Sequence, residues 1–221
     1  MRVSALEGHA IWSEVYDQTP NPLLELERRT VMPWLPYLED QTFVDVACGT
    51  GRWARYAADR GAHVFGADFC APMLAAAATV RNRCVLADAL RLPFPDGLAD
   101  VTVCAFTAGY VASPARLVDE LARITCPGGC ILLSDVHPRA FEMGWQRSFR
   151  RAGDVYEIEH YAHATSAYLS AASDRGLKIE HIAEASFGEP EREIFRQCRR
   201  EAGFEGMSRV PAIFAVLWRR A

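Results

Sequence analysis

Acids and glycines between residues 43 and 68 have the types and spacing of a ligand site. Asp45 stands in an apolar run that breaks at Gly49 and Gly51, and Asp68 closes the next apolar run. Glycines between a strand and a helix leave backbone N–H groups free and let a ligand approach the main chain. An acid after the second strand is suited to accept ribose hydroxyls. The spacing therefore predicts a site for an adenosine-containing ligand.

Two nucleotide ligands fit such a turn. Gly49, Gly51 and Ala54 match the dinucleotide fingerprint GxGxxA, so NAD is one alternative. Asp45 disfavours it, because an acid at the mouth of the turn repels a pyrophosphate and attracts an ammonium or sulfonium group. Asp88, after the third apolar run, is expected to point at the same crevice. For each acid, a helix cap or a surface position is the structural alternative.

Apolar runs alternate with helical patterns through the middle of the chain. Strands are expected at 43–47, 63–68, 83–88, 100–106 and 130–136, with helices at 52–61, 71–82 and 114–125. Helices are also expected at 6–17, 22–38, 165–176 and 190–203, and strands at 177–186 and 212–220, whereas 139–163 shows no clean period. Apolar strands that alternate with helices predict an α/β fold with a parallel sheet covered on both faces.

Composition limits the class of protein. The chain has 221 residues and is 50% hydrophobic, which argues for one domain. Its net charge of −4 argues against a nucleic acid as the partner. Its 7 cysteines are scattered without a CxxC pair, as in reduced cytoplasmic proteins, and no cluster has metal-ligand spacing. No run approaches the roughly 20 apolar residues of a membrane span, and the N-terminus does not read as a signal peptide. We expect a cytoplasmic protein without a metal.

The run VDVACGTG, residues 44–51, resembles the first motif of class I S-adenosylmethionine-dependent methyltransferases. The similarity continues through Asp68, APML (71–74), residues 87–106 and residues 121–136, and it is closest to the small type 11 subgroup. It implies a doubly wound, Rossmann-like sheet of seven strands, mostly parallel, with an antiparallel C-terminal strand. It also implies a lid at 1–40, a cofactor-binding core at 41–136, a variable substrate-side segment at 137–176 and completion of the sheet by 177–221.

The resemblance also implies the cofactor, S-adenosyl-L-methionine, with S-adenosyl-L-homocysteine as the product. Gly49 and Gly51 would approach its methionine part, Asp45 would support the ammonium group, Asp68 would bind the ribose and Asp88 the adenine amino group. The implied cofactor-binding residues are Asp45, Ala47, Gly49, Gly51, Asp68, Phe69, Met73, Asp88, Ala89, Ala105 and Phe106.

A sulfonium methyl group is already activated, so in-line displacement depends on positioning and desolvation. A base is needed only when the acceptor must lose a proton. His137, after the fifth strand, is the candidate base, and Tyr16, in the implied lid, is the candidate that closes on the methyl group or holds the acceptor. The alternatives are a loop cap for His137 and helix packing for Tyr16. His160 and His163 are further candidates for the same pocket.

The function expected from the resemblance is methyl transfer to an O, N, C or S atom of a small-molecule acceptor. Aromatic residues within 139–163 suit an aromatic or lipidic acceptor, although core packing is an alternative for them. The stretch 104–111 lacks the Asn/Asp-Pro-Pro-aromatic motif of base methylases. A non-catalytic cofactor-binding scaffold or partner subunit and an NAD-dependent oxidoreductase are the other functions considered. The acceptor atom and the oligomeric state stay open.

Overall fold

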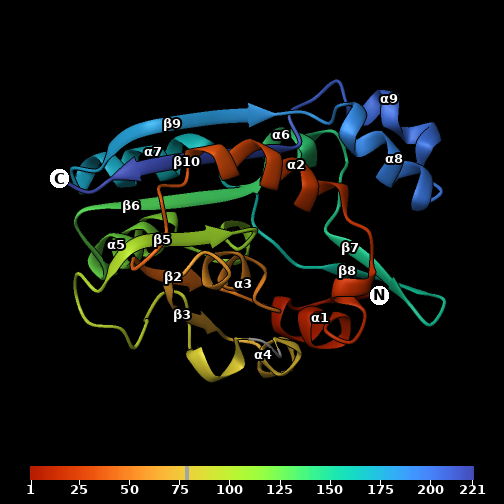
Figure 1. The fold of residues 1–221 in the computed structure, drawn as a ribbon. Helices are drawn as coiled ribbons and strands as arrows, with labels where there is room; N and C mark the ends of the chain where they lie inside the picture. Colours follow the sequence, from red (N-terminus) through yellow and green to blue (C-terminus); the bar gives the residue numbers. More distant parts are fainter. Residues whose placement is uncertain (78–79) are drawn as a thin grey trace.

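A seven-stranded sheet forms the centre of the fold in the computed structural model, which describes residues 1–77 and 80–221 (Figure 1). Its strands are β2 Thr42–Val46, β3 His63–Asp68, β4 Cys84–Leu86, β5 Ala99–Ala105, β6 Thr125–Val136, β9 Lys178–Ala185 and β10 Ile213–Arg219. Their order is β4-β3-β2-β5-β6-β10-β9. β10 is antiparallel to β6 and β9, and the other adjacent pairs are parallel. The predicted doubly wound sheet with an antiparallel C-terminal strand is confirmed.

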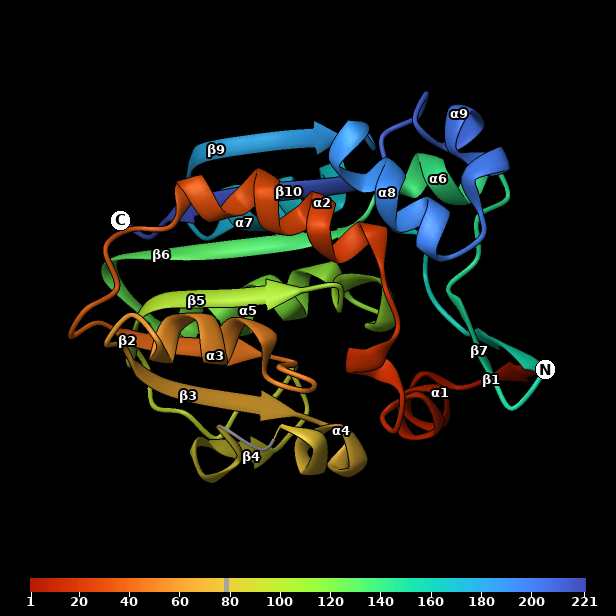
Figure 2. The same ribbon diagram turned by 45° about the vertical axis from the view of Figure 1, so that its right-hand side comes forward.

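Helices cover both faces of this sheet. α2 (Pro22–Val31) and α3 (Arg52–Ala58) lie on one face, and α5 (Pro114–Ile124) and α7 (Thr165–Asp174) lie on the other (Figures 1 and 2). Successive side chains of a strand point to opposite faces. Phe43 accordingly belongs to the apolar cluster that contains Trp53 of α3, whereas Val44 belongs to the cluster that contains Leu117 of α5. Burial on both sides explains why the strands are apolar throughout.

A second, smaller structure lies beyond the carboxyl ends of the parallel strands (Figure 2). It comprises α1 (Ala5–Trp12) and a three-stranded sheet of β1 (Arg2–Val3), β8 (Asp154–Ile158) and β7 (Ser148–Arg151), in that order. The sequence did not predict this sheet, because its strands are too short to show a period. In addition, β1 pairs with a strand from a distant part of the chain, with Arg2 opposite Glu157.

Proline accounts for one difference between predicted and observed elements. The helix expected at 22–38 ends at Val31 and continues as a short 3-10 turn, η2 (Met32–Trp34). Pro33 has no N–H to continue the α-helical hydrogen bonds. The helix expected at 6–17 also divides, into α1 and a second 3-10 turn, η1 (Tyr16–Gln18), although no proline lies in it.

Other boundaries shift for local reasons. The strand expected at 130–136 already begins at Thr125. Residues 126–129 form an irregularity in it, because Ala99 of β5 pairs with Thr125 whereas Val101 pairs with Cys130. The helix expected at 190–203 divides at Arg199, whose φ is +55°. Of the helix expected at 71–82, the structure forms 71–76, and residues 78 and 79 lie outside the described residues.

The remaining elements are short. They are α4 Ala71–Ala76, η3 Arg81–Arg83, η4 Ala108–Tyr110, α6 Pro138–Glu142, α8 Glu189–Gln197, η5 Glu201–Gly203 and α9 Phe204–Met207. Within the described ranges, none of the helices combines the length and apolar character needed to cross a membrane.

Candidate active site

Two cavities adjoin at the carboxyl ends of the parallel strands. The smaller has a volume of about 80 Å³ and lies over the glycine turn. The larger, of about 580 Å³, lies among α1, α2, the small sheet and the α8–α9 region. The two share the side chains of His9, Tyr16, Leu24, Phe106 and Tyr110. A ligand in the smaller cavity would therefore face a ligand in the larger one across these five residues.

Most of the predicted cofactor residues meet at the smaller cavity. Its lining includes the predicted residues Tyr16, Asp45, Ala47, Gly49, Asp68, Phe69, Met73, Ala105 and Phe106. Gly51, Asp88, Ala89 and His137 are absent from this lining. The chain segments after β2, β3 and β5 converge here because parallel strands end at the same edge of the sheet.

The two glycines of the turn have different structural roles. Gly49 adopts φ +54°, and its N–H donates to Asp68 Oδ2 at 2.8 Å. Gly51 adopts φ +83°, and a Cβ there would lie 2.5 Å from Cγ2 of Val80. Gly49 therefore belongs to the cavity wall, whereas Gly51 allows the turn to pack closely against the chain after α4. Asp68 is fixed as well, since its Oδ1 accepts from the Cys70 N–H at 2.8 Å.

Asp45, a residue of β2, is buried against the first turn of α3. Its Oδ2 accepts a hydrogen bond from the Ala54 N–H at 2.9 Å. Burial raises the pKa of Asp45 to about 7, although the Ala54 N–H and the Arg52 guanidinium favour the charged form. Burial also raises the pKa of Asp68, against the hydrogen bonds that its oxygens accept. Both carboxylates would thus gain from a cationic or hydroxyl-bearing ligand that replaces lost solvation.

Arg52 supplies a positive charge to the same cavity. Its Nη1 lies 2.8 Å from Oε2 of Glu27, a fully buried residue of α2. Glu27 Oε1 accepts from Trp53 Nε1 at 3.2 Å and from Ser134 Oγ at 2.8 Å. The predicted site did not include Arg52. Its position directly after Gly51 is the sequence feature from which its place in the site could have been predicted.

Two backbone positions beside the cavity are strained. Ala47, after β2, and Phe106, after β5, both adopt φ +56°, and both line the smaller cavity. A left-handed conformation costs a non-glycine residue roughly 1–2 kcal/mol, and such strain concentrates at ligand sites. The two turns shape the cavity where β2 and β5 lie side by side.

Aromatic side chains dominate the larger cavity. They are Trp12, Tyr16, Phe106, Tyr110, Phe141, Trp145, Phe149, Phe187 and Phe195. Tyr156 and Tyr161, which belong to the same aromatic-rich part of the sequence, are absent from its lining. Arg147, Arg150 and Arg200 also line it. The side chain of Arg147 is 8% exposed, pairs with buried Asp135 and lies over the Tyr110 ring at 4.5 Å. A flat, largely apolar molecule with a polar group suits such a wall.

The segment that joins α1 to α2 closes over the glycine turn. Thr50 Oγ1 donates to Asp17 Oδ1 at 2.7 Å, and Arg55 Nη1 lies 3.8 Å from Asp17 Oδ2. Tyr16 lines both cavities, and its hydroxyl forms no hydrogen bond within the described part of the chain. Burial raises the pKa of Tyr16 to about 12, so the phenol is protonated at neutral pH.

His137 is buried outside the linings of both cavities. Its Nδ1 accepts from the Arg139 N–H at 3.1 Å and so caps α6, while Nε2 lies 3.2 Å from Oε1 of Glu184. The alternative of a structural cap, noted from the sequence, describes these contacts. His160 and His163 also bond to backbone, through the carbonyl oxygens of Ile158 and Val111.

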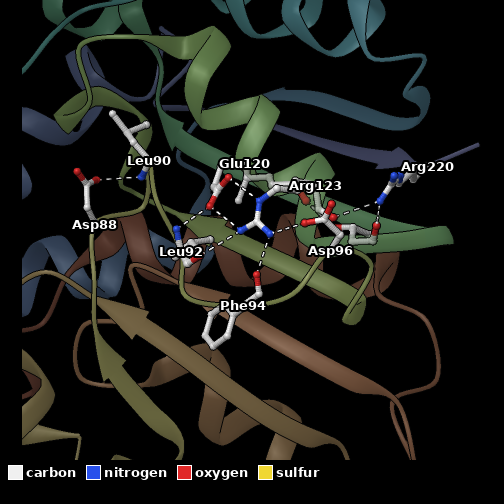
Figure 3. A network of polar contacts seen from close by, with 10 residues as sticks. Asp88, Leu90, Leu92, Phe94, Asp96, Glu120, Arg123 and Arg220 are labelled. Carbon is white, nitrogen blue, oxygen red and sulfur yellow. Dashed lines mark hydrogen bonds and ion pairs between the residues drawn. The ribbon is translucent and has the colours of Figure 1, made fainter.

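Asp88 is exposed and bonds locally. Its Oδ1 accepts from the Leu90 N–H at 2.9 Å, just before a loop that runs to β5. Glu120 and Arg123 of α5 hold that loop through backbone groups of Leu92 and Phe94 (Figure 3). Asp88 and Ala89 therefore lie at the start of a loop that α5 holds, and both are absent from the lining of the smaller cavity.

Sequence reasoning missed the cavity residues of the first helix and the small sheet. His9 lies at the junction of the two cavities, and Arg147 precedes β7. A signal existed for His9, because His9, Trp12 and Tyr16 are spaced as residues on one face of a helix. No comparable pattern surrounds Arg147, whose position depends on its ion pair with Asp135.

The fold and the site define a Rossmann-like protein that binds its ligand across the carboxyl ends of parallel strands, with acids and a glycine turn around it. A family model described as a methyltransferase domain matches residues 44–133. A demethylmenaquinone methyltransferase of Mycobacterium tuberculosis is 30% identical over 167 residues, which cover 76% of this chain and 68% of that protein. The chain belongs to the class I S-adenosylmethionine-dependent methyltransferases, in the type 11 subgroup, and is an enzyme that uses S-adenosylmethionine.

Two further similarities agree with this assignment. A demethylmenaquinone methyltransferase of Thermus thermophilus is 40% identical over 119 residues, which cover 49% of this chain and 54% of that protein, so the match spans about half of that relative's length. The crystal structure of an S-adenosylmethionine dependent methyltransferase from Mesorhizobium loti superposes with a TM-score of 0.70 at 22% identity, covering 90% of this chain and 100% of that one. The structural likeness supports the fold.

Proposed function

We propose that this enzyme transfers the methyl group of S-adenosylmethionine to a hydroxylated aromatic acceptor of the quinol class. One observation carries the proposal: a cavity of about 580 Å³ with an aromatic wall opens onto the cavity over the glycine turn. Two relatives named demethylmenaquinone methyltransferase support a quinone-type ring. The acceptor atom would be a carbon or an oxygen of that ring.

The residues of the smaller cavity fit the cofactor's polar groups. Its amino-acid end is a zwitterion, for which Asp45 would take the ammonium and Arg52 the carboxylate. Asp68 would accept from the ribose, and Phe69 and Met73 would flank the adenine. When bound, S-adenosylmethionine supplies an activated sulfonium methyl group.

Further cofactor contacts are proposed at the rim. Asp88 and Ala89 would meet the adenine edge from the loop beside β3, while Ala47, Gly49, Ala105 and Phe106 would line the path to the acceptor. Gly51 would support the turn from behind, because its close neighbour is Val80.

We infer that residues 1–40 act as a lid. A volume of about 80 Å³ is small beside the several hundred Å³ of a typical cofactor site. The segment around Tyr16 would therefore move outward when the cofactor enters, breaking the Thr50–Asp17 bond. The core at 41–136 would hold the cofactor, 137–176 would shape the acceptor cavity, and 177–221 would complete the sheet.

The protein's part in the reaction would be positioning and exclusion of water. A closed lid would bring Tyr16 to the junction of the cavities, where its protonated hydroxyl would donate to an acceptor oxygen. His137 would contribute by capping α6, whose Phe141 belongs to the aromatic wall.

The free state of Cys48 and the other six cysteines supports a cytoplasmic location.

The test is a methylation assay with demethylmenaquinol, analysed by mass spectrometry. We expect the reduced quinol to gain one methyl group, with S-adenosylhomocysteine as the co-product. The oxidised quinone is the matched control, because its electron-poor ring is a weak nucleophile. No methyl gain on the quinol, with cofactor binding intact, would contradict the proposed acceptor.

Cofactor binding is tested separately by calorimetric titration with S-adenosylhomocysteine. Asp68→Ala should weaken binding by about 1–3 kcal/mol, since it removes both the ribose acceptor and the bond that fixes Gly49. NADH in a parallel titration should not bind. An Asp68→Ala protein with unchanged affinity would remove Asp68 from the site.

A further inference from the structure

His9 is placed at the point where the two cavities meet. It belongs to α1 and lines both cavities. Its ring stands edge-on to Tyr110, with ring centroids 4.9 Å apart, and lies 6.2 Å from the ring of Trp12. Gly8 lets α1 approach β8 closely, since a Cβ there would lie 2.8 Å from Cγ1 of Ile158. The imidazole is therefore held in a fixed position relative to the small sheet.

The hydrogen bond of His9 determines which ring nitrogen is basic. Nδ1 lies 2.7 Å from the carbonyl oxygen of Ala5. A carbonyl oxygen only accepts, so Nδ1 carries the proton and Nε2 presents a lone pair. Nε2 forms no hydrogen bond with any residue that the structure describes. It also differs from His137 Nε2, which is buried outside both cavities and lies 3.2 Å from Glu184 Oε1.

The surroundings of His9 favour the neutral imidazole. Burial lowers its pKa from the ordinary 6.5, the Ala5 carbonyl opposes the shift, and the positive charge of Arg147 adds to it. The other titratable groups at this junction are Tyr16 and Tyr110, whose pKa values burial raises, so they carry no charge at neutral pH. The carboxylate of Asp135 is buried and pairs with Arg147. A neutral imidazole with a free lone pair is a competent proton acceptor.

We propose that His9 is the general base of the methyl transfer, taking the proton of the acceptor's ring hydroxyl through Nε2. This inference rests on the proposed function, because it needs an acceptor hydroxyl in the larger cavity. The O–H bond breaks as its proton moves to Nε2, and the released electron pair, through the oxygen or a conjugated ring carbon, forms the new bond to the methyl carbon. The methyl–sulfur bond breaks, and the sulfur keeps that pair as a neutral thioether.

The proton balance closes within the same site. His9 leaves the step as an imidazolium and returns its proton to water when the lid opens. Where the ring carbon is methylated, the hydrogen on that carbon leaves as a proton when aromaticity is restored and the ring oxygen takes up a proton, so that each turnover releases one proton in total. No oxidant or reductant takes part. Arg147, which lies on the same wall, stabilises the negative charge that develops on the acceptor oxygen.

The experiment compares wild type, His9→Gln, His9→Ala and His63→Gln with demethylmenaquinol across pH. His63 is the matched control, because it is an exposed histidine at the start of β3, at the opposite edge of the sheet. We expect His9→Gln to lose about 10²-fold or more in kcat/KM, with S-adenosylhomocysteine affinity close to that of wild type. His63→Gln should keep wild-type turnover.

Two readouts separate a base from a structural residue. With S-adenosylmethionine saturating at every pH, so that protonation of Asp45 does not limit the rate, wild-type turnover should fall on the acid side at an apparent pKa below 6.5, and this limb should disappear in His9→Gln. Added imidazole should restore part of the turnover of His9→Ala. Wild-type turnover in His9→Gln would overturn the inference. If neither His9 variant folds, a pH–rate profile of the wild type without the acid limb would overturn it. Absence of methyl transfer by wild type would instead count against the proposed function.

Discussion

Asp45 shows how a single buried side chain links solvation to ligand binding. Its carboxylate lies under the glycine turn, accepts one backbone hydrogen bond and has a pKa raised to about 7 by burial. The free protein therefore holds a proton on Asp45 over much of the range below neutral pH. An ammonium group bound beside it would favour the charged form and displace that proton.

We predict that affinity for S-adenosylhomocysteine rises with pH up to about 7, by at most roughly tenfold per pH unit for one linked proton, and then levels off. Asp45→Asn should bind more weakly at pH 8 and lack this dependence. Calorimetry at pH 6 in buffers of different ionisation enthalpy should detect proton release from the wild type alone. The same pH dependence in Asp45→Asn would show that another group is responsible.

The raised pKa of Asp45 also bears on stability. The folded protein binds this proton more tightly than the unfolded chain, so the contribution is fully present below about pH 4 and is lost as pH rises towards 7. Urea unfolding of wild type and Asp45→Asn between pH 4 and 8 should show a steeper loss in the wild type, because the raised pKa of Asp68 acts in both proteins. Parallel curves for the two proteins would contradict it.

At the scale of elements, the position of α1 depends on its contact with the small sheet. Gly8 is buried against Ile158, which is fully buried, and a Cβ at Gly8 would also lie 3.2 Å from Cγ2 of Val3. The helix that carries His9 is therefore fitted to β1 and β8 by the absence of one side chain. Arg151 adds a charged contact to Glu14 at the end of the same segment.

Gly8→Ala tests this fit against Gly206→Ala, a helical glycine with open space around it. Alanine favours a helix by about 0.5–1 kcal/mol, so Gly206→Ala should be neutral or slightly stabilising. At Gly8, overpacking of roughly 1–3 kcal/mol should offset that gain or exceed it and displace α1. The free energy of unfolding, measured in urea, and the turnover rate should both fall for Gly8→Ala alone. Equal behaviour of the two variants would mean that α1 is loosely fitted.

At the scale of the whole molecule, both cavities lie between the sheet and segments that cross its carboxyl edge. The N-terminal segment is bonded to the glycine turn through Asp17 and Thr50, and α2 sends the buried Glu27 to Arg52. A ligand bound at this edge would therefore contact both the sheet and the segments that cover it. A ligand that binds only the native state stabilises all of it.

We predict that S-adenosylhomocysteine at 100 times its Kd raises the stability of the protein by about 2.7 kcal/mol. For a chain of this size, that corresponds to a rise in Tm of roughly 5–10 °C. Differential scanning fluorimetry with NADH at the same concentration is the control and should show no shift. A comparable shift with NADH would mean that the turn accepts a dinucleotide.

The run from residue 43 to residue 68 was predictable because its signals are local. An apolar strand, a glycine turn, a helix and a second strand ending in an acid occur within one short stretch, and their order fixes where Asp45, Gly49 and Asp68 lie. The alternation of such units likewise determined the parallel sheet. The position of Asp88 was harder to predict, because its exposure depends on a loop held by Glu120 and Arg123.

The sequence by itself thus determined the α/β sheet, its helix layers and the acids and glycines at its carboxyl edge. Only the tertiary structure decided that α1 docks on β8, that Arg147 pairs with Asp135, and that His9 rather than His137 lies between the cavities. The physical reason is the separation along the chain over which each kind of interaction acts. Strand and turn preferences act between neighbours, whereas these contacts join distant segments through packing and charge pairing that leave no period in the sequence.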